Sequence, residues 1–174
     1  GERKGTYDLI AAAELAVRQN PRLKLCLAGD GEVEPVRALV KGKGLEENIA
    51  VPGWIDAAEK LRRLREAATL VLPSYHEGMP MAILEGMAAG KAIISTAVGA
   101  IPEVITEENG ILVEPGGVPA LADALLRCSG DLNLLEAMSR NNREKAKQEF
   151  GVRRMHEKLA EYYRQAAEQG GQHG

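Results

Sequence analysis

Hydrophobic and polar residues recur along this chain with two periods, one typical of helices and one typical of strands. The segment 6–20 repeats apolar residues at helical spacing and stops before Pro21, which predicts a helix. The segment 23–28 then alternates leucine with Lys24 and Cys26 before a Gly-Asp-Gly turn. This alternation predicts a short strand that leads into a loop.

The same order of strand, loop and helix recurs further along the chain. Strand-like segments follow at 48–54, 69–78, 91–99 and 110–117, with helix-like segments between them at 33–44, 57–68, 80–90 and 101–109. Five short apolar strands, most of them alternating with helices, predict an α/β domain with a parallel sheet and helices on both faces. From Val118 onward only helical patterns remain, at 118–128, 132–150 and 152–169. We expect one domain over residues 1–169 and a disordered tail at 170–174.

Composition narrows the class of protein. A chain of 174 residues with 45% hydrophobic content can bury the core of one domain. Its net charge of -3 supplies no basic surface for nucleic acid. No apolar run approaches the roughly 20 residues that span a bilayer, so we expect a soluble, cytoplasmic protein. Cys26 and Cys128 lie in apolar segments without metal-site spacing, and we expect free, buried thiols.

The start of the pattern is unusual for a doubly wound fold. The chain opens with a helix after "GERKG", whereas such folds begin with a strand whose following loop contacts the ligand. We therefore expect that a first strand, which would precede Gly1, is absent from this sequence.

Glu85 is the only carboxylate in the apolar segment from Pro80 to Gly90. Pro80 suits the first helical position and Gly90 the end, which predicts a helix of about three turns. A face of small residues, formed by Ala82, Gly86 and Ala89, is expected to admit a ligand or another backbone. A buried carboxylate needs hydrogen-bond donors, and a ribose diol supplies two. The alternatives are that Glu85 caps a neighbouring backbone or pairs with Lys91 or an arginine.

Glu77 lies upstream, where a strand ends and a loop leads into this helix. Open α/β sheets bind ligands at that edge, and the amino terminus of the helix favours phosphate. Gly78 would allow a ligand to approach the backbone closely. Glu77 is then placed to accept hydrogen bonds from a sugar, although a carboxylate there can also simply stabilise the positive helix end.

The segment 73–105 closely resembles the donor-binding signature of the retaining glycosyltransferases called group 1 or family 4, with their E-x7-E motif. Glu77 and Glu85 match its two glutamates. The segments "RKGTYDLIAA", "LAGDGE", "VPGW" and "NGILVEPG" are similar to further family motifs in the same order. The resemblance implies the carboxy-terminal, nucleotide-sugar-binding half of a two-domain GT-B enzyme, with a Rossmann-like fold and without its acceptor-binding domain.

The resemblance also implies residue roles. Lys4 would neutralise the diphosphate of the donor, Glu85 would hold the ribose, and Glu77 would contact the transferred sugar, so Lys4 and Glu77 are the expected catalytic residues. Other donor contacts are expected from the backbone of Gly78, Met79 and Pro80 and from the base-contacting loop of Gly53, Trp54 and Ile55. Packing of Trp54 against the sheet is an equal alternative. The family's usual arginine, a few residues before the lysine, is expected upstream of Gly1, because Arg3 directly adjoins Lys4.

The expected function is therefore the transfer of a hexose from a UDP- or GDP-linked donor to a glycan or lipid, in polysaccharide biosynthesis. We expect no cofactor and no metal, because no D-x-D cluster is present. The absent domain would be a partner, and the full-length enzyme could contact the inner face of the membrane. The chain alone is expected to bind nucleotide weakly and to transfer nothing. A non-catalytic nucleotide-sugar-binding module and a sugar-nucleotide epimerase are the alternatives.

Overall fold

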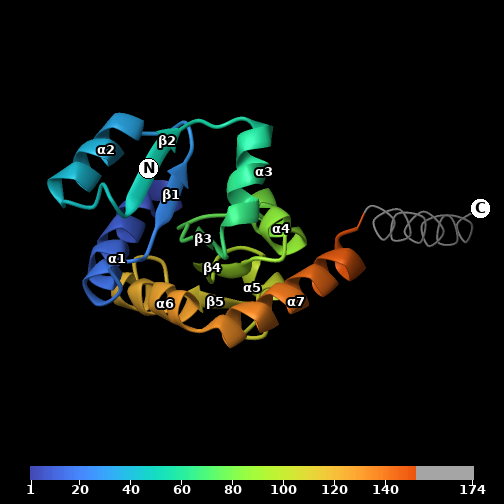
Figure 1. Cartoon of the computed structure of the whole chain (residues 1–174). Coiled ribbons are helices and arrows are strands. Elements are labelled where there is room, and N and C mark those ends of the chain that lie inside the picture. The colour runs from blue at the N-terminus through green and yellow to red at the C-terminus, as the bar shows by residue number, and fades with distance from the viewer. Residues whose placement is uncertain (152–174) are drawn as a thin grey trace, which may run out of the picture.

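The computed structural model describes residues 1–151, so the predicted helix at 152–169 and the tail at 170–174 lie outside the described part. Strands and helices alternate along it (Figure 1). The strands are β1 (Leu25–Ala28), β2 (Ile49–Gly53), β3 (Thr69–Leu72), β4 (Ala92–Thr96) and β5 (Gly110–Val113). The helices are the 3-10 helix η1 (Glu2–Lys4), α1 (Thr6–Gln19), α2 (Val33–Gly42), α3 (Ala57–Glu66), α4 (Met81–Ala88), α5 (Ile101–Val104), α6 (Val118–Gly130) and α7 (Leu132–Glu149).

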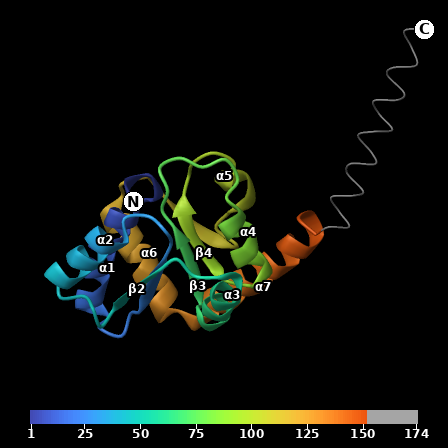
Figure 2. The same ribbon diagram turned by 90° about the horizontal axis from the view of Figure 1, so that it is seen from above.

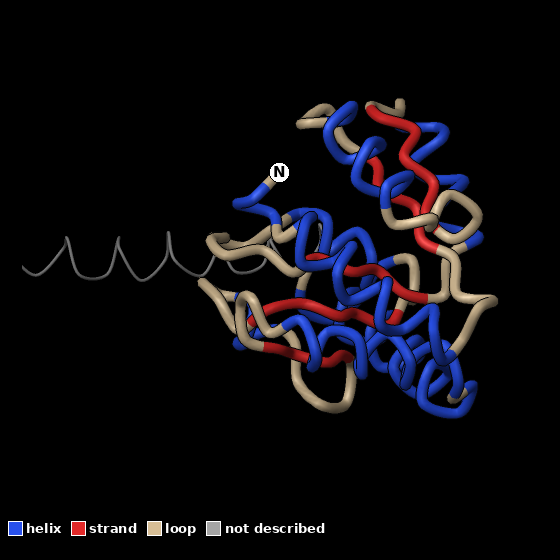
Figure 3. The backbone as a smooth tube through the Cα atoms, turned by 90° about the vertical axis from the view of Figure 1, so that its left-hand side faces the viewer, coloured by secondary structure: helices blue, strands red, loops and turns tan. Residues whose placement is uncertain are grey.

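All five predicted strands are present and every pairing between them is parallel. They do not form the single sheet that the pattern predicts. β1 pairs only with β2, whereas β3, β4 and β5 form a separate sheet with β4 in its centre (Figure 3). In this second sheet Ile93 lies opposite Leu70 on one side and Gly110 on the other.

Strand β4 carries the core, because every one of its residues is buried. Successive side chains of a strand point to opposite faces, and Ile93 and Ile94 accordingly join different hydrophobic clusters. Ile94 packs with residues of α1 and α6, whereas Ile93 packs with residues of α4 and α5. In Figure 2, β3 and β4 lie between α1 and α6 on one side and α3 and α4 on the other. The prediction of helices on both faces is thus confirmed.

A third cluster joins α1 and α2 to the small sheet through Ile10, Val36 and Ile49. The other face of β1 is open, since Cys26 is exposed. The expectation of two buried thiols is therefore wrong for Cys26, although Cys128 is buried. No disulfide links the two cysteines.

Helix α4 is shorter than predicted. Pro80 has an extended backbone and is the residue before the helix, and α4 ends at Ala88. Gly90, with its positive φ of 66°, follows as the turn residue. Among the helices of residues 1–151, none is long and apolar enough to span a membrane.

Candidate functional site

The segment before α1 and the loop after β3 meet at the carboxyl ends of the strands. The backbone N–H of Tyr75 donates to the carbonyl of Arg3 over 3.0 Å, and the Tyr75 hydroxyl donates to Asp8 over 2.8 Å. Gly5 makes this contact possible, because a Cβ there would lie 2.0 Å from the carbonyl oxygen of Pro73. These contacts place Lys4 next to the loop that carries Glu77.

The Glu77 loop is also fixed from β4. Ser95 Oγ donates to the carbonyl of Leu72 over 2.7 Å, and Thr96 Oγ1 donates to that of Ser74 over 2.5 Å. Gly99, with a φ of 55°, approaches so closely that a Cβ would lie 2.1 Å from the carbonyl oxygen of Glu77. The loop between β3 and α4 is therefore held on two sides by backbone and short side chains.

Lys4 and Glu77 form an ion pair, with 2.5 Å between Lys4 Nζ and Glu77 Oε1. The Glu77 side chain is 9% exposed and that of Lys4 is 43% exposed. Burial alone would raise the pKa of the Glu77 carboxyl, but the hydrogen bond from Lys4 and the charges of Lys4 and Arg3 outweigh it. The pKa therefore lies below its ordinary value, and Glu77 is ionised at neutral pH. Its charge makes it a hydrogen-bond acceptor.

A cavity of about 520 Å³ opens beside this pair, and we call it the Lys4 cavity. Lys4 and Arg3 line it together with the Gly29–Gly31 turn after β1 and Pro73 after β3. Open α/β sheets bind ligands at this carboxyl edge, where the strand order reverses. The positive charges of Arg3 and Lys4 at this cavity favour the binding of an anionic group of a ligand.

Glu85 does not have the environment that the sequence suggested. Lys60 Nζ, from α3, lies 2.8 Å and 3.0 Å from the two Glu85 carboxylate oxygens. The Glu85 side chain is 40% exposed. The interpretation of a buried carboxylate without an internal partner is therefore wrong, and the expected alternative partners, Lys91 or an arginine, are replaced by Lys60. The apolar residues around Glu85 in sequence do not surround it in space.

On the small-residue face of α4, Gly86 fulfils the second expected alternative, the close approach of another element of the chain. Gly86 is buried against the sheet, where a Cβ would lie 2.9 Å from Leu70 and 3.1 Å from Ile93. It therefore serves close packing of helix on strand rather than ligand approach. Ala82, in contrast, does line the Lys4 cavity.

Glu85 lines a second cavity, of about 510 Å³, which we call the Glu85 cavity. Ala82 and residues of β1 and β3 line both cavities, so the two adjoin. Ile55 lines the Glu85 cavity as well. Of the other expected donor contacts within residues 1–151, neither cavity is lined by Gly53, Trp54, Glu77, Gly78, Met79 or Pro80.

The predicted base-contacting loop lies at the carboxyl end of β2. Gly53 ends the strand and its carbonyl accepts the N–H of Gly29 over 2.9 Å. Trp54 is 71% exposed, so the alternative that it packs against the sheet is wrong. The exposed indole leaves Trp54 free to stack on a planar group.

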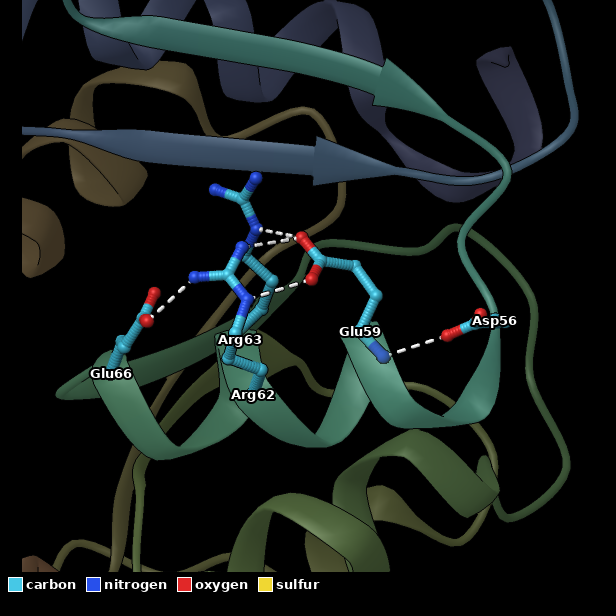
Figure 4. A network of polar contacts seen from close by, with 5 residues as sticks. All are labelled: Asp56, Glu59, Arg62, Arg63 and Glu66. Atoms are coloured by element: carbon cyan, nitrogen blue, oxygen red, sulfur yellow. Dashed lines mark hydrogen bonds and ion pairs between the residues drawn. The ribbon is translucent and has the colours of Figure 1, made fainter.

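Helix α3 lines part of the Glu85 cavity, and most of its basic side chains form ion pairs. Two of its basic residues, Arg62 and Arg63, pair within the helix, where Glu59 accepts from them over 2.6 Å and 2.7 Å (Figure 4). These hydrogen bonds lower the pKa of Glu59 to about 2. Asp56 caps the helix by accepting the N–H of Glu59 over 2.7 Å. The positive charge suggested by "KLRRLR" is thus largely compensated.

Two residues of the site escaped sequence reasoning. Arg3 lines the Lys4 cavity even though it directly adjoins Lys4 in the sequence. Lys60 escaped because it is one of several basic residues on α3, and only the fold selects it as the partner of Glu85.

In the part of the chain that the structure describes, no three His, Cys, Asp or Glu residues gather as a metal site would require.

Comparison with known proteins identifies the family. Residues 1–131 match the family described as "Glycosyl transferases group 1". The putative colanic acid biosynthesis glycosyltransferase WcaL of Salmonella typhimurium is 32% identical over 168 residues, covering 91% of this chain and 41% of that protein. This chain therefore spans less than half the length of such a relative.

Solved structures give the same assignment. The C-terminal domain of the group 1 glycosyl transferase LpcC from Francisella tularensis has a TM-score of 0.79 and 29% identity, over 87% of this chain and 82% of that one. Anabaena HepE, solved in complex with UDP, has a TM-score of 0.85 at 24% identity over 95% of this chain and 46% of that one, which shows likeness of fold. This chain accordingly belongs to the group 1 glycosyltransferases, and its fold is that of the carboxy-terminal domain of a GT-B enzyme.

Proposed function

We propose that this chain is the donor-binding domain of a retaining glycosyltransferase and binds a nucleoside-diphosphate sugar, UDP- or GDP-linked. The observation that carries the proposal is the Lys4–Glu77 ion pair beside the Lys4 cavity, at the carboxyl ends of β1 and β3. HepE, a protein of the same fold, was solved with UDP. Family membership makes transfer of a sugar the reaction that this site would serve.

The diphosphate would lie at the basic end of the Lys4 cavity, near Lys4 and Arg3. Negative charge grows on this leaving group as the bond to the sugar breaks, and preorganised cations stabilise it most. The free N–H groups at the start of α4 add positive potential close to the Glu77 loop. Asp30 and Glu32 also line the cavity, and their negative charges would repel phosphate toward Lys4 and Arg3.

Glu77 would change its partner when the donor binds. Its carboxylate is ionised and mostly buried, and Lys4 is its partner without ligand. Once Lys4 turns toward the diphosphate, Glu77 can accept hydrogen bonds from sugar hydroxyls. The pair thus keeps both charges compensated before the donor arrives.

Glu85 would bind the ribose by exchanging Lys60 for the ribose hydroxyls. The Lys60–Glu85 pair is half-exposed, and exposed ion pairs contribute only about 0–1 kcal/mol. Breaking the pair therefore costs little compared with two hydrogen bonds to a charged acceptor, which contribute about 1.5–3 kcal/mol each. Glu85 needs no burial to fulfil this role.

Isothermal titration of the chain with UDP and GDP tests the proposal. We expect Lys4→Met to weaken nucleoside-diphosphate binding by about tenfold or more, because a charge-assisted contact to phosphate is lost. Binding of the unphosphorylated nucleoside should change little. Lys41→Met, which removes an exposed lysine of α2 that lines neither cavity, is the matched control.

The ribose contact has its own test. Glu85→Gln should abolish the preference for UDP over 2′,3′-dideoxy-UDP, and Glu136→Gln on α7 should leave it unchanged. Absence of binding to both nucleotides at millimolar concentration, or equal affinity of the Lys4→Met and unaltered chains, would refute the assignment of this site.

A further inference from the structure

Ser74 is a buried hydroxyl residue in the loop after β3, three residues before Glu77. Its exposed fraction is 0%. Within residues 1–151, its Oγ is one of two buried side-chain polar atoms without a hydrogen-bond partner. The other is Oδ1 of Asn142, whose amide nitrogen still donates to two carbonyls. Of these two side chains, only that of Ser74 is therefore without any hydrogen bond.

A buried hydroxyl without a partner is unfavourable, because it has lost its hydrogen bonds to water. The two buried hydroxyls of β4 avoid this cost. Ser95 donates to the carbonyl of Leu72, and Thr96 donates to the carbonyl of Ser74. Alanine would fill the position of Ser74 without the penalty, so packing alone does not explain a serine there.

The Ser74 hydroxyl acts on the Glu77 carboxylate. Burial, the largest influence, raises the pKa of Glu77, and hydrogen bonding by Lys4 and then by Ser74 lowers it. The hydroxyl therefore lies near the carboxylate. It does not complete a hydrogen bond of ordinary geometry while Lys4 Nζ contacts Glu77 Oε1.

The backbone holds Ser74 and Glu77 in a fixed relation. The Ser74 carbonyl accepts from Thr96, and the carbonyl of Glu77 lies against Gly99. Between them, the N–H of Tyr75 donates to η1. A hydroxyl hydrogen can rotate toward a new acceptor without movement of this backbone.

We propose that Ser74 is a positioning residue for Glu77, and that its hydroxyl donates to the Glu77 carboxylate once Lys4 turns to the diphosphate of the sugar nucleotide. The inference rests on the proposed function, in which Lys4 makes this exchange. One carboxylate oxygen is then held by Ser74 from within the loop. The other is directed to the hydroxyls of the sugar.

The burial of Glu77 explains why a resident donor is needed. Its side chain is 9% exposed, so water cannot readily replace Lys4 as its partner. Glu85 provides the contrast, because its side chain is 40% exposed and water can solvate it when Lys60 leaves. A buried donor is therefore required beside the first glutamate only.

NMR titration of the Glu77 carboxyl carbon tests the proposal in four chains. These are the unaltered chain, Ser74→Ala, Lys4→Met and the double variant, in which Lys4→Met imitates the departure of the lysine. In the double variant, burial is opposed only by the charge of Arg3, the smallest influence on this pKa. We therefore expect the pKa of Glu77 to rise above its ordinary value of 4.5, and above that in Lys4→Met alone.

Two results would overturn the proposal. One is an equal pKa of Glu77 in Lys4→Met and in the double variant. The other is a pKa in the double variant that stays at or below 4.5. A merely structural Ser74 gives the second result, because a loosened loop exposes the carboxyl to water and returns its pKa to the ordinary value.

Ser95→Ala is the matched control, since Ser95 is also a fully buried serine and is not among the groups that act on Glu77. Combined with Lys4→Met, it should change the pKa of Glu77 less than Ser74→Ala does. It should also lower the free energy of unfolding more, because the carbonyl of Leu72 loses its donor. Equal effects of the two serine variants on the pKa would refute a specific role of the Ser74 hydroxyl.

None of these titrations requires a nucleotide. Failure of UDP to bind would therefore count against the proposed function, while the titrations would still decide whether Ser74 acts as the donor to Glu77.

Discussion

Gly99 fixes the position of the Glu77 loop at the scale of one residue. Its φ of 55° is a conformation that side chains with a Cβ disfavour, and its Cα approaches the carbonyl of Glu77. We expect Gly99→Ala to lower the free energy of unfolding by about 1–3 kcal/mol, measured by urea denaturation. Gly78→Ala is the control, because no atom lies within 4 Å of a Cβ there. A similar loss in both variants would contradict this explanation.

The lowered pKa of Glu77 makes a second prediction at this scale. A carboxyl with a lowered pKa in the folded protein stabilises it above the unfolded pKa, whose ordinary value is 4.5. That contribution is lost as the pH falls through the folded pKa. Lys4→Met should therefore raise the pKa of Glu77, followed by NMR of the carboxyl carbon, and its stability deficit should shrink in acid.

Lys41→Met, which removes an exposed cation that is not among the groups acting on the Glu77 carboxyl, should leave that titration unchanged. A stability deficit of Lys4→Met that stays constant from neutral to acidic pH would show that the ion pair is not its cause.

At the scale of elements, one buried amide fixes α7 to the large sheet. Asn142 Nδ2 donates to the carbonyls of Lys91 and Asn109, which precede β4 and β5, over 2.8 Å and 2.6 Å. Asn142→Ala should lower the free energy of unfolding by about 2 kcal/mol or more, since two buried carbonyls lose their donor. Chemical denaturation measures this loss.

Asn141 provides the matched control, because it donates one exposed hydrogen bond to the carbonyl of Glu108. Asn141→Ala should cost less than about 1 kcal/mol. Comparable losses in the two variants would indicate that helix propensity, rather than the buried contact, determines the effect.

At the scale of the whole molecule, this chain covers 41% of the length of its WcaL relative. Catalysis of transfer needs the acceptor held against the donor in one geometry, and the site proposed above would provide for the donor alone. We predict that the 174-residue chain binds UDP but transfers no sugar. Product analysis after incubation with UDP-sugar and candidate acceptors tests this, and transfer that exceeds the background of a Lys4→Met sample would contradict it.

Sequence alone determined the elements and the family. The positions of all five strands follow from local periodicity and turn residues, which depend on neighbours in the chain. The motifs around Lys4, Glu77 and Glu85 indicated the family because they are short patterns of neighbouring residues. The ion pair shows that Lys4 and Glu77 do meet in space.

Only the tertiary structure decided the surroundings of each side chain. Glu85 has apolar neighbours in sequence, yet α3 brings Lys60 to it from 25 residues away. Gly86 packs on Leu70 and Ile93, and Arg3 joins Lys4 at one cavity. The division into two sheets likewise depends on which strands find partners. Burial and pairing arise from contacts between distant segments, and local periodicity contains no information about those distances.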